Sequence, residues 1–187
     1  MLLKNIRRWL APVAGLFFTF LLCVSCENDM NEIRKITLKS TDPDERTRNM
    51  EMLMTDSGYA KVQILATLVE TYSSPAAITK LKDGVRINFF DEDGRISSVL
   101  TAKYGEVLKD EDKMMVRDSV TLYSIKKNQK LETEQLYWTQ RDSVIYTEKP
   151  VKVTTPDAIL FGEGLKCDQE FTSYEFFAPK GSMNMKQ

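Results

Sequence analysis

The side chains that could do chemistry in this chain are acidic residues and glycines in short clusters. Asp91-x-Asp93-Gly94 is similar to the start of a calcium-binding loop, in which carboxylate oxygens hold the ion. Such a loop ends with a glutamate, but Ala102 stands at that position here. A plain hairpin turn is therefore the expectation for this segment, and we predict no metal site.

Other motifs also argue against catalysis. The 187 residues include no histidine, which excludes serine or cysteine triads with an imidazole base and most zinc sites. Glu132 and Glu134 could exchange protons, but carboxylates on alternate residues of an exposed strand are usually only solvated. Gly162-x-Gly164 lacks the third glycine of a dinucleotide loop, so it favours a β-bulge or relief of crowding. We predict no catalytic residue, no cofactor and no enzyme.

The elements that would position these residues repeat along the chain. When Leu100–Ser124 is aligned with Leu131–Thr155 without a gap, the large apolar positions coincide. A weaker third copy follows around Leu165, and a partial copy lies at Val85–Phe89. A repeat of about 30 residues is typical of stacked or wrapped strands, in which each unit buries its apolar face against its neighbours.

Alternating apolar residues and polar breaks predict strands from about Glu51 onward. Tyr59–Tyr72 alternates and is expected to be a strand, although its apolar residues also fit a helical stripe. Asp93-Gly94 predicts a hairpin turn before a strand that begins near Ile96. Polar breaks of turn length lie at 110–113, 126–129 and 140–143. This pattern indicates an all-β sandwich, barrel or jelly roll.

A short peptide recurs outside the repeat. Arg-Asp-Ser-Val occurs at 117–120 and again at 141–144, and the spacing of the two copies differs from the repeat offset. We interpret it as a coincidence in sequence that is rich in turns.

The first 26 residues have the pattern of a bacterial export signal. Three basic residues precede an uncharged stretch at 9–24, and Ser25 lies directly before Cys26. The pattern resembles a lipoprotein signal peptide, with Cys26 as the lipidation site. The alternative is an uncleaved membrane anchor, but sixteen uncharged residues are fewer than the roughly 20 of a spanning helix.

We therefore expect three parts: a signal peptide at 1–25, a lipidated N-terminus and flexible spacer at 26–50, and a folded β domain at 51–187. The alternative for the polar spacer is a short surface helix. Removing residues 1–25 takes away three of the 26 basic residues and none of the 27 acidic ones, which leaves a net charge of −4 and argues against a nucleic-acid partner. With Cys26 lipidated, Cys167 has no partner for an internal disulfide.

Four segments together resemble the LptC family of lipopolysaccharide-export proteins. Their order and spacing carry the resemblance, which covers about Tyr59 to Met183. The segments are Leu100–Gly105, Leu131–Trp138, Thr147–Val151 and Gly162–Leu165.

The resemblance implies a fold, a place and partners. The fold would be an antiparallel β-jelly-roll, or twisted open β-sandwich, on the periplasmic face of the inner membrane of a Gram-negative bacterium. It would be held to the inner-membrane ABC transporter subunits of the export complex and would pass lipopolysaccharide to a periplasmic bridge protein of similar fold. Family members are commonly held by one transmembrane helix, so a lipid on Cys26 would be a departure.

A trough lined by inward-facing residues would suit that function. Exposing an acyl chain of about 14 carbons to water costs on the order of 11 kcal/mol, at about 0.8 kcal/mol per methylene. Free edge strands at each end of the fold could pair with a neighbour's edge and make the trough continuous. The alternative for every lining residue is ordinary core packing. The expected lipid-contacting residues are Val85, Ile87, Phe89, Val107, Val116, Val120, Leu122, Leu136, Trp138, Tyr146, Val151, Val153, Leu165 and Phe176.

Two other functions remain open from the sequence. One is an envelope lipoprotein whose closed β-scaffold serves adhesion or assembly without lipid transport. The other is a small hydrolase acting on envelope polymers, for which the sequence offers no recognisable nucleophile or carboxylate pair.

Overall fold

The computed structural model describes residues 42–185 except 75, 109 and 110, and only the backbone of 181–185. The expected signal peptide, Cys26 and residues 26–41 of the expected spacer lie outside the described residues. Within the part that is described, no helix could span a membrane.

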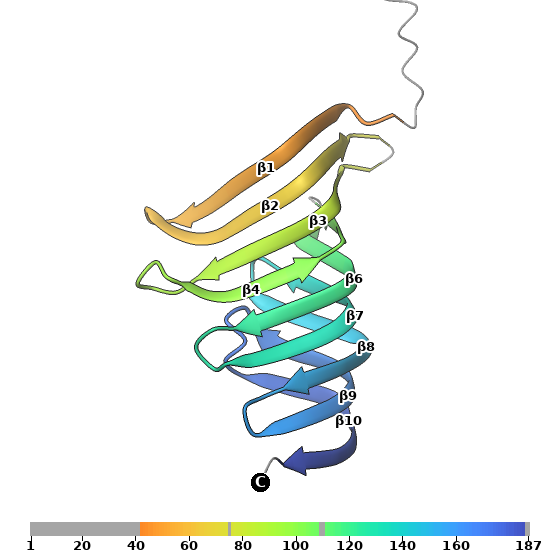
Figure 1. Ribbon diagram of the computed structural model, residues 1–187. Helices are drawn as coiled ribbons and strands as arrows, with labels where there is room; N and C mark the ends of the chain where they lie inside the picture. The colour runs from red at the N-terminus through yellow and green to blue at the C-terminus, as the bar shows by residue number, and fades with distance from the viewer. Residues whose placement is uncertain (1–41, 75, 109–110, 186–187) are drawn as a thin grey trace, which may run out of the picture. The chain divides into compact units, whose positions relative to one another are not determined.

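Ten antiparallel strands make up almost all of the described chain (Figure 1). The prediction of an all-β antiparallel fold is confirmed. In chain order the strands are β1 (Glu45–Asp56), β2 (Tyr59–Tyr72), β3 (Ile78–Phe90), β4 (Ile96–Ala102), β5 (Tyr104–Leu108), β6 (Lys113–Ser124), β7 (Gln129–Thr139), β8 (Val144–Thr154), β9 (Ala158–Asp168) and β10 (Tyr174–Met185).

The strands form one sheet in the order β1-β2-β3-β4-β6-β7-β8-β9-β10. The short strand β5 pairs with β3 and β6, so it continues the line of β4 between the same two neighbours. Because nearly every strand pairs with the next one along the chain, β1 and β10 are the two edges of the sheet (Figure 1).

Two local predictions are confirmed by the hairpins. Tyr59–Tyr72 is strand β2 throughout its length. The turn between β3 and β4 is held by the Asp91 carboxylate, which accepts hydrogen bonds from the backbone N–H of Asp93 at 3.1 Å and of Arg95 at 2.8 Å. Gly94 has φ of 75°, the left-handed conformation that glycine tolerates best. The acidic motif therefore builds a turn.

A row of irregular positions crosses the whole sheet, and we call it the crease. At this level β3, β6 and β8 each carry one more residue than the strand beside them, so they bulge. Backbone bonds join the bulges: Gly84 donates to Lys103 O at 3.1 Å, and Lys103 donates to Asp118 O at 3.0 Å. The crease comprises Asn49, Thr67, Asp83–Gly84, Lys103, Asp118–Ser119, Glu134, Glu148–Lys149, Gly164 and Phe177.

Bulges bend strands and increase their twist, so an aligned row of them lets one sheet fold over on itself. The folding is seen in contacts between strands that are not neighbours. Phe89 of β3 touches Trp138 of β7, and the side-chain amide of Gln129 on β7 donates to the carbonyl oxygen of Phe171 after β9. The core lies between the facing layers. Its fully buried apolar side chains are Ile87, Phe89, Leu122, Leu131, Ile145, Val153, Leu165 and Phe171.

Two features differ from the sequence-based expectations. Strand β1 begins at Glu45, inside the segment expected to be a spacer. The sequence did not indicate this strand because its many charged residues obscure the alternation of its apolar ones. The first Arg-Asp-Ser-Val lies within β6 at the crease, whereas the second lies at the turn before β8. Ser119 and Ser143 have φ of 58° and 53°, so the serine is left-handed in both copies, and in the first copy Asp118 is left-handed too, with φ of 70°.

Candidate functional site

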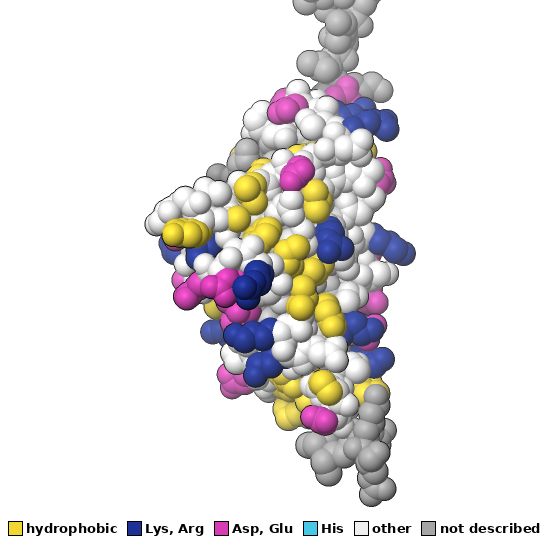
Figure 2. All heavy atoms as spheres, turned by 60° about the vertical axis from the view of Figure 1, so that its left-hand side comes forward, with side chains coloured by type: hydrophobic (Ala, Val, Ile, Leu, Met, Phe, Trp, Pro, Cys, Tyr) yellow, Lys and Arg dark blue, Asp and Glu magenta, His cyan; other side chains and the backbone are white. Residues whose placement is uncertain are grey.

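An apolar groove of about 670 Å³ lies between β1 and the strands that face it. Polar residues also line it, among them Glu45, Asp112, Lys113 and Gln140. Figure 2 shows that hydrophobic side chains also gather in a band on one face of the domain, between charged groups. The apolar lining of the groove consists of Met50, Met52, Met54, Ile64, Val69, Leu81, Val107, Leu108, Met114 and Trp138.

Strand β1 supplies one wall of the groove. Met50, Met52 and Met54 occupy alternate positions and therefore point to the same face of the sheet. Met52 is 45% exposed although it lies opposite the buried Ile64 of β2. Methionine is unbranched and polarizable, so it adapts to irregular apolar surfaces. The wall is thus both apolar and deformable.

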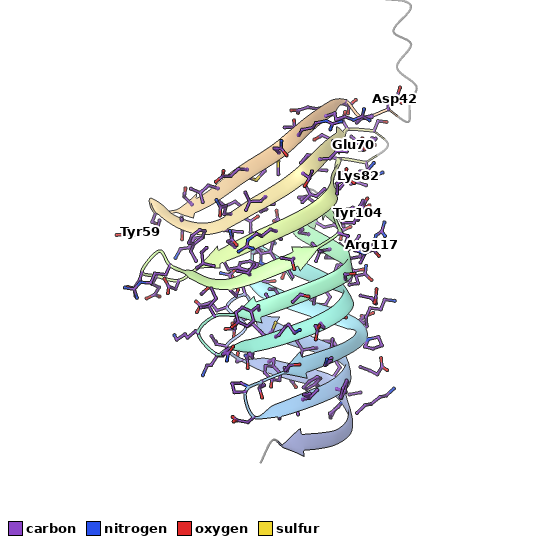
Figure 3. All side chains as sticks on the ribbon, in the orientation of Figure 1. Asp42, Tyr59, Glu70, Lys82, Tyr104 and Arg117 are labelled. Carbon is purple, nitrogen blue, oxygen red and sulfur yellow. The ribbon has the colours of Figure 1, made fainter. Side chains whose placement is uncertain are left out.

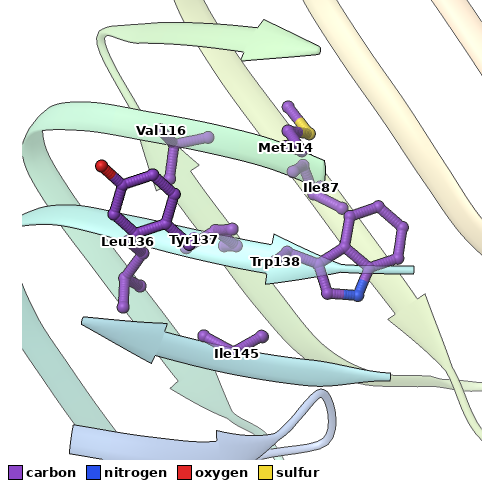
Figure 4. Close-up of a pocket in the computed structure, with 8 residues that line it drawn as sticks. Ile87, Met114, Val116, Leu136, Tyr137, Trp138 and Ile145 are labelled. Atoms are coloured by element: carbon purple, nitrogen blue, oxygen red, sulfur yellow. The ribbon is translucent and has the colours of Figure 1, made fainter. Parts of the chain in front are cut away.

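The groove ends at a closed interior. Phe89 and Trp138 meet edge to face, with ring centroids 5.5 Å apart. Beside them lies an enclosed gap whose lining includes Ile87, Leu136 and Ile145, and it has no room for a water molecule (Figure 4). The middle of the domain is therefore packed, while the end at β1 is open.

Most of the expected lining residues lie in this packed interior. Eleven of the fourteen are buried, and Val107 and Phe176 are partly buried against the same core. Of the fourteen, Val107 and Trp138 also line the open groove. Whether they contact lipid stays a prediction. The eleven are Val85, Ile87, Phe89, Val116, Val120, Leu122, Leu136, Trp138, Val151, Val153 and Leu165.

Tyr146 lies on the opposite face of the sheet from the one we expected. Its ring stacks on that of Tyr137, with centroids 5.2 Å apart and planes inclined by 20°, and the two residues are paired across β7 and β8. Neighbouring residues of a strand point to opposite faces, so the interior position belongs to the buried Ile145.

Comparison with known families agrees with this architecture. Residues 14–175 match the family model described as "Lipopolysaccharide-assembly, LptC-related". The chain belongs to the LptC family. LptC proteins are periplasmic and associated with the inner membrane of Gram-negative bacteria, and membership implies a part in lipopolysaccharide transport. No curated protein matches the chain.

The LptC resemblance in the sequence missed the methionines of β1. The segments that carried it begin at Leu100, and the expected domain began at Glu51, so Met50 was assigned to the spacer. The usable signal was the alternation of Met50, Met52 and Met54, with Glu51 and Leu53 between them.

A buried carboxylate holds the outer side of the groove wall of this LptC protein. The Glu70 side chain on β2 is 5% exposed and is bound by Arg46 of β1 at 2.8 Å and Lys82 of β3 at 2.6 Å. The Tyr72 hydroxyl donates to it at 2.9 Å. The hydrogen bond from Lys82 lowers the pKa of Glu70 to about 2, against the opposing effect of burial. Three strands are thereby tied together.

A second polar group lies below the Glu70 group on the same side of the domain in Figure 3. The Tyr104 hydroxyl donates to the Glu106 carboxylate at 2.5 Å, and the Arg117 guanidinium lies 4.2 Å from the centre of the Tyr104 ring. Burial, followed by the hydrogen bond to Glu106, raises the pKa of Tyr104. These residues flank the crease on β5 and β6.

The described residues offer no evident site for a metal or a reactive thiol. No group of three or more acidic or cysteine side chains among them is arranged to hold a metal ion. Cys167 is 5% exposed, and burial raises the pKa of its thiol, which keeps it protonated and unreactive.

Proposed function

We propose that this protein is the membrane-anchored periplasmic component of a lipopolysaccharide export machinery. It accepts lipopolysaccharide from the inner-membrane ABC transporter and passes it through the apolar interior to a periplasmic bridge protein of similar fold. The observation that carries the proposal is the open, methionine-lined groove that leads to the aromatic contact of Phe89 and Trp138.

The groove has the size and lining of a lipid entry site. Its volume of about 670 Å³ lies within the roughly 300–1,000 Å³ of typical ligand pockets. Each methylene moved from water into it gains about 0.8 kcal/mol. The deformable wall formed by Met50, Met52 and Met54 accommodates acyl chains of differing length and branching, since methionine repacks readily.

The packed interior is the second stage of the path. The two layers separate to admit acyl chains between the inward-facing residues. These are the thirteen expected lining residues other than Tyr146. The crease is the line about which they separate, because a bulged line has weaker pairing than the regular ladders on either side.

The two edge strands suit partners of the same fold. β1 and β10 each pair with one neighbour among the described residues, so each has a free edge. Leu53 of β1 and Phe177 of β10 are both 54% exposed, which provides apolar contact beside the backbone hydrogen bonds of an added strand. One edge would receive lipid from the transporter side and the other would deliver it to the bridge protein.

We further propose that a lipid on Cys26 tethers the domain to the membrane. The support is the sequence pattern of the first 26 residues. A tether of this kind leaves residues 27–44 between the lipidated cysteine and β1.

A closed β-scaffold for adhesion or assembly is the second candidate. The absence of room for water in the gap beside Trp138 favours it, because a permanently packed interior carries no lipid. The two candidates differ in whether lipid ever enters the groove.

In-cell photocrosslinking tests whether lipid enters the groove. Benzoyl-phenylalanine replaces Met52, which lines the groove, and in a matched control it replaces the adjacent Leu53, which points to the other face. A lipopolysaccharide adduct at 52 and none at 53 supports transport. Adducts at neither position, in a folded and exported protein, favour the closed scaffold.

The same pair of probes can be placed deeper. Trp138 faces the interior and Tyr137 faces outward, so an adduct at 138 but not at 137 would show that lipid passes beyond the groove.

A further inference from the structure

The Trp138 indole N–H lacks a hydrogen-bond partner. The residue is 5% exposed, and its Nε1 atom is out of contact with solvent and bonded to nothing among the described residues. Buried polar atoms are almost always paired in folded proteins, so an orphaned donor needs an explanation.

Trp138 lies at the boundary between the open and the closed space. Its ring lines the 670 Å³ groove and also the enclosed gap beside Ile87 and Ile145 (Figure 4). Met114 likewise lines both the groove and the gap. A chain that moves from the groove into the gap would therefore contact Trp138 and Met114.

The protein itself provides no acceptor on the closed side. The gap is lined by aliphatic and aromatic residues and has no room for water, so a buried water cannot serve the indole there. The flexible side chains of Met54 and Met114, on the groove side, can yield to an incoming chain. The donor is therefore available to an acceptor that a ligand brings from the groove side.

We propose that the Trp138 Nε1–H donates a hydrogen bond to an oxygen atom carried on the acyl chain of the transported lipid, either a hydroxyl or an ester or amide carbonyl. This inference rests on the proposed function, because it takes the lipid into the groove. It adds a point of polar recognition to a path that is otherwise apolar.

The consequence is discrimination between acyl chains. A plain alkyl chain of the same length leaves the indole N–H unpaired, whereas an oxygenated chain pairs it. A single neutral hydrogen bond of this kind corresponds to a difference in affinity of about fivefold.

Trp138 can be observed separately from the rest of the protein. The chain contains two tryptophans, Trp9 and Trp138, so the full-length protein labelled with ¹⁵N-tryptophan gives at most two indole N–H signals. The Trp138→Phe variant identifies the relevant signal and removes the donor while keeping an aromatic ring against Phe89.

The experiment follows that signal in polymer-stabilised full-length protein. Three probes are titrated: tetradecanoate, 3-hydroxytetradecanoate and methyl tetradecanoate. We expect a downfield shift of the Trp138 indole proton with 3-hydroxytetradecanoate or with methyl tetradecanoate, and none with tetradecanoate, whose oxygens belong to a charged carboxylate that stays in water. If the hydroxyl is the acceptor, 3-hydroxytetradecanoate should bind about fivefold more tightly than tetradecanoate. A shift with the methyl ester in place of the hydroxy acid assigns the bond to a carbonyl.

Two variants complete the test. Trp138→Phe should bind 3-hydroxytetradecanoate and tetradecanoate with equal affinity, while Tyr137→Phe, on the outer face, should keep the preference of the unaltered protein. Binding of every probe without an indole shift, or a preference in Trp138→Phe as large as that of the unaltered protein, overturns the inference and leaves lipid transport standing. Failure of the unaltered protein to bind any probe or lipopolysaccharide itself counts against the proposed function.

Discussion

The ring of Phe89 meets the ring of Trp138 edge to face, with centroids 5.5 Å apart and planes inclined by 80°, although β4 and β6 lie between their strands in the sheet. Edge-to-face geometry of this kind adds about 0.5–1.5 kcal/mol beyond the area that the rings bury. The contact is where the folded sheet closes on itself, so it separates an open groove from a sealed core.

Replacing Phe89 with alanine should destabilise the closed interior. Phe89 is fully buried, and the loss of a buried phenylalanine costs about 3–5 kcal/mol. Urea unfolding followed by circular dichroism measures the change. Phe90→Ala, one residue along the strand and only partly buried, is the control and should cost less than half as much. Equal losses would mean that the aromatic contact is not the closing element.

A charge in the groove should block lipid entry without unfolding the domain. Met52→Asp places a carboxylate where acyl chains are proposed to bind, yet Met52 is 45% exposed, so the carboxylate stays hydrated in the empty protein. We expect at least a tenfold loss of lipopolysaccharide binding with a change in unfolding free energy below about 1 kcal/mol.

Leu53→Asp is the matched control for that change, because Leu53 is 54% exposed on the other face. It should leave lipopolysaccharide binding unaltered, as measured on the purified proteins. A loss of the same size in both variants would point to damage to strand β1 rather than to the groove.

The ion pairs of Glu70 should make stability depend on pH. Its pKa falls from 4.5 to about 2 on folding, so its contribution is complete above pH 4.5 and is lost as the pH falls towards 2. Arg46 is 58% exposed, so solvent screens its attraction for Glu70, and we expect Glu70→Gln to cost about 1–2 kcal/mol at pH 7. Urea unfolding of both proteins between pH 2 and pH 7 should show the difference shrinking below pH 4.5. A difference that stays constant over this range would contradict a stabilising role for the ionised Glu70 carboxylate.

Glu134→Gln is the control, because Glu134 is exposed on β7. This change should alter stability by less than about 0.5 kcal/mol.

Gly164 should be the least replaceable glycine of the crease. It has φ of 73°, and a Cβ atom there would lie 3.1 Å from the Thr147 backbone oxygen and 2.4 Å from Phe177 Cδ2. Gly164→Ala should therefore cost about 2 kcal/mol, from backbone strain and crowding together. Gly58→Ala isolates the strain, because Gly58 has φ of 85° and nothing within 4 Å of the added atom, and about 1 kcal/mol is expected. Thermal unfolding compares the two, and equal costs would show that crowding at Gly164 is relieved by movement of Phe177.

The sequence predicted the strands and turns better than the groove between the strand layers. Alternation identified Tyr59–Tyr72, and turn chemistry identified Asp93-Gly94, because both depend on local backbone preferences. The glycine pair was also interpreted usefully: Gly164 marks an irregular position, and a Cβ atom on Gly162 would lie 2.3 Å from Phe176.

What the sequence did not decide was which of two neighbouring apolar residues faces inward. Tyr146 was expected inside because it is large and apolar, but the buried residues of β8 are Ile145, Thr147, Val151 and Val153, and Tyr146 alternates with them on the other face. The groove was missed for a different reason. It depends on the distance between β1 and the β5–β7 layer, which is a long-range property that no local pattern of Met50 or Met52 contains.

The crease also limits how the sheet can be extended. Pairing skips Asn49 on one edge strand and Phe177 on the other, so a strand added to either edge meets an interruption at one fixed height. An added strand that is shifted by two residues keeps its backbone hydrogen bonds, but its own irregular position no longer lies beside the crease. If partners of similar fold pair with these edges, as we propose, the crease would favour one alignment, in which the irregular positions and the interiors of the two folds are continuous.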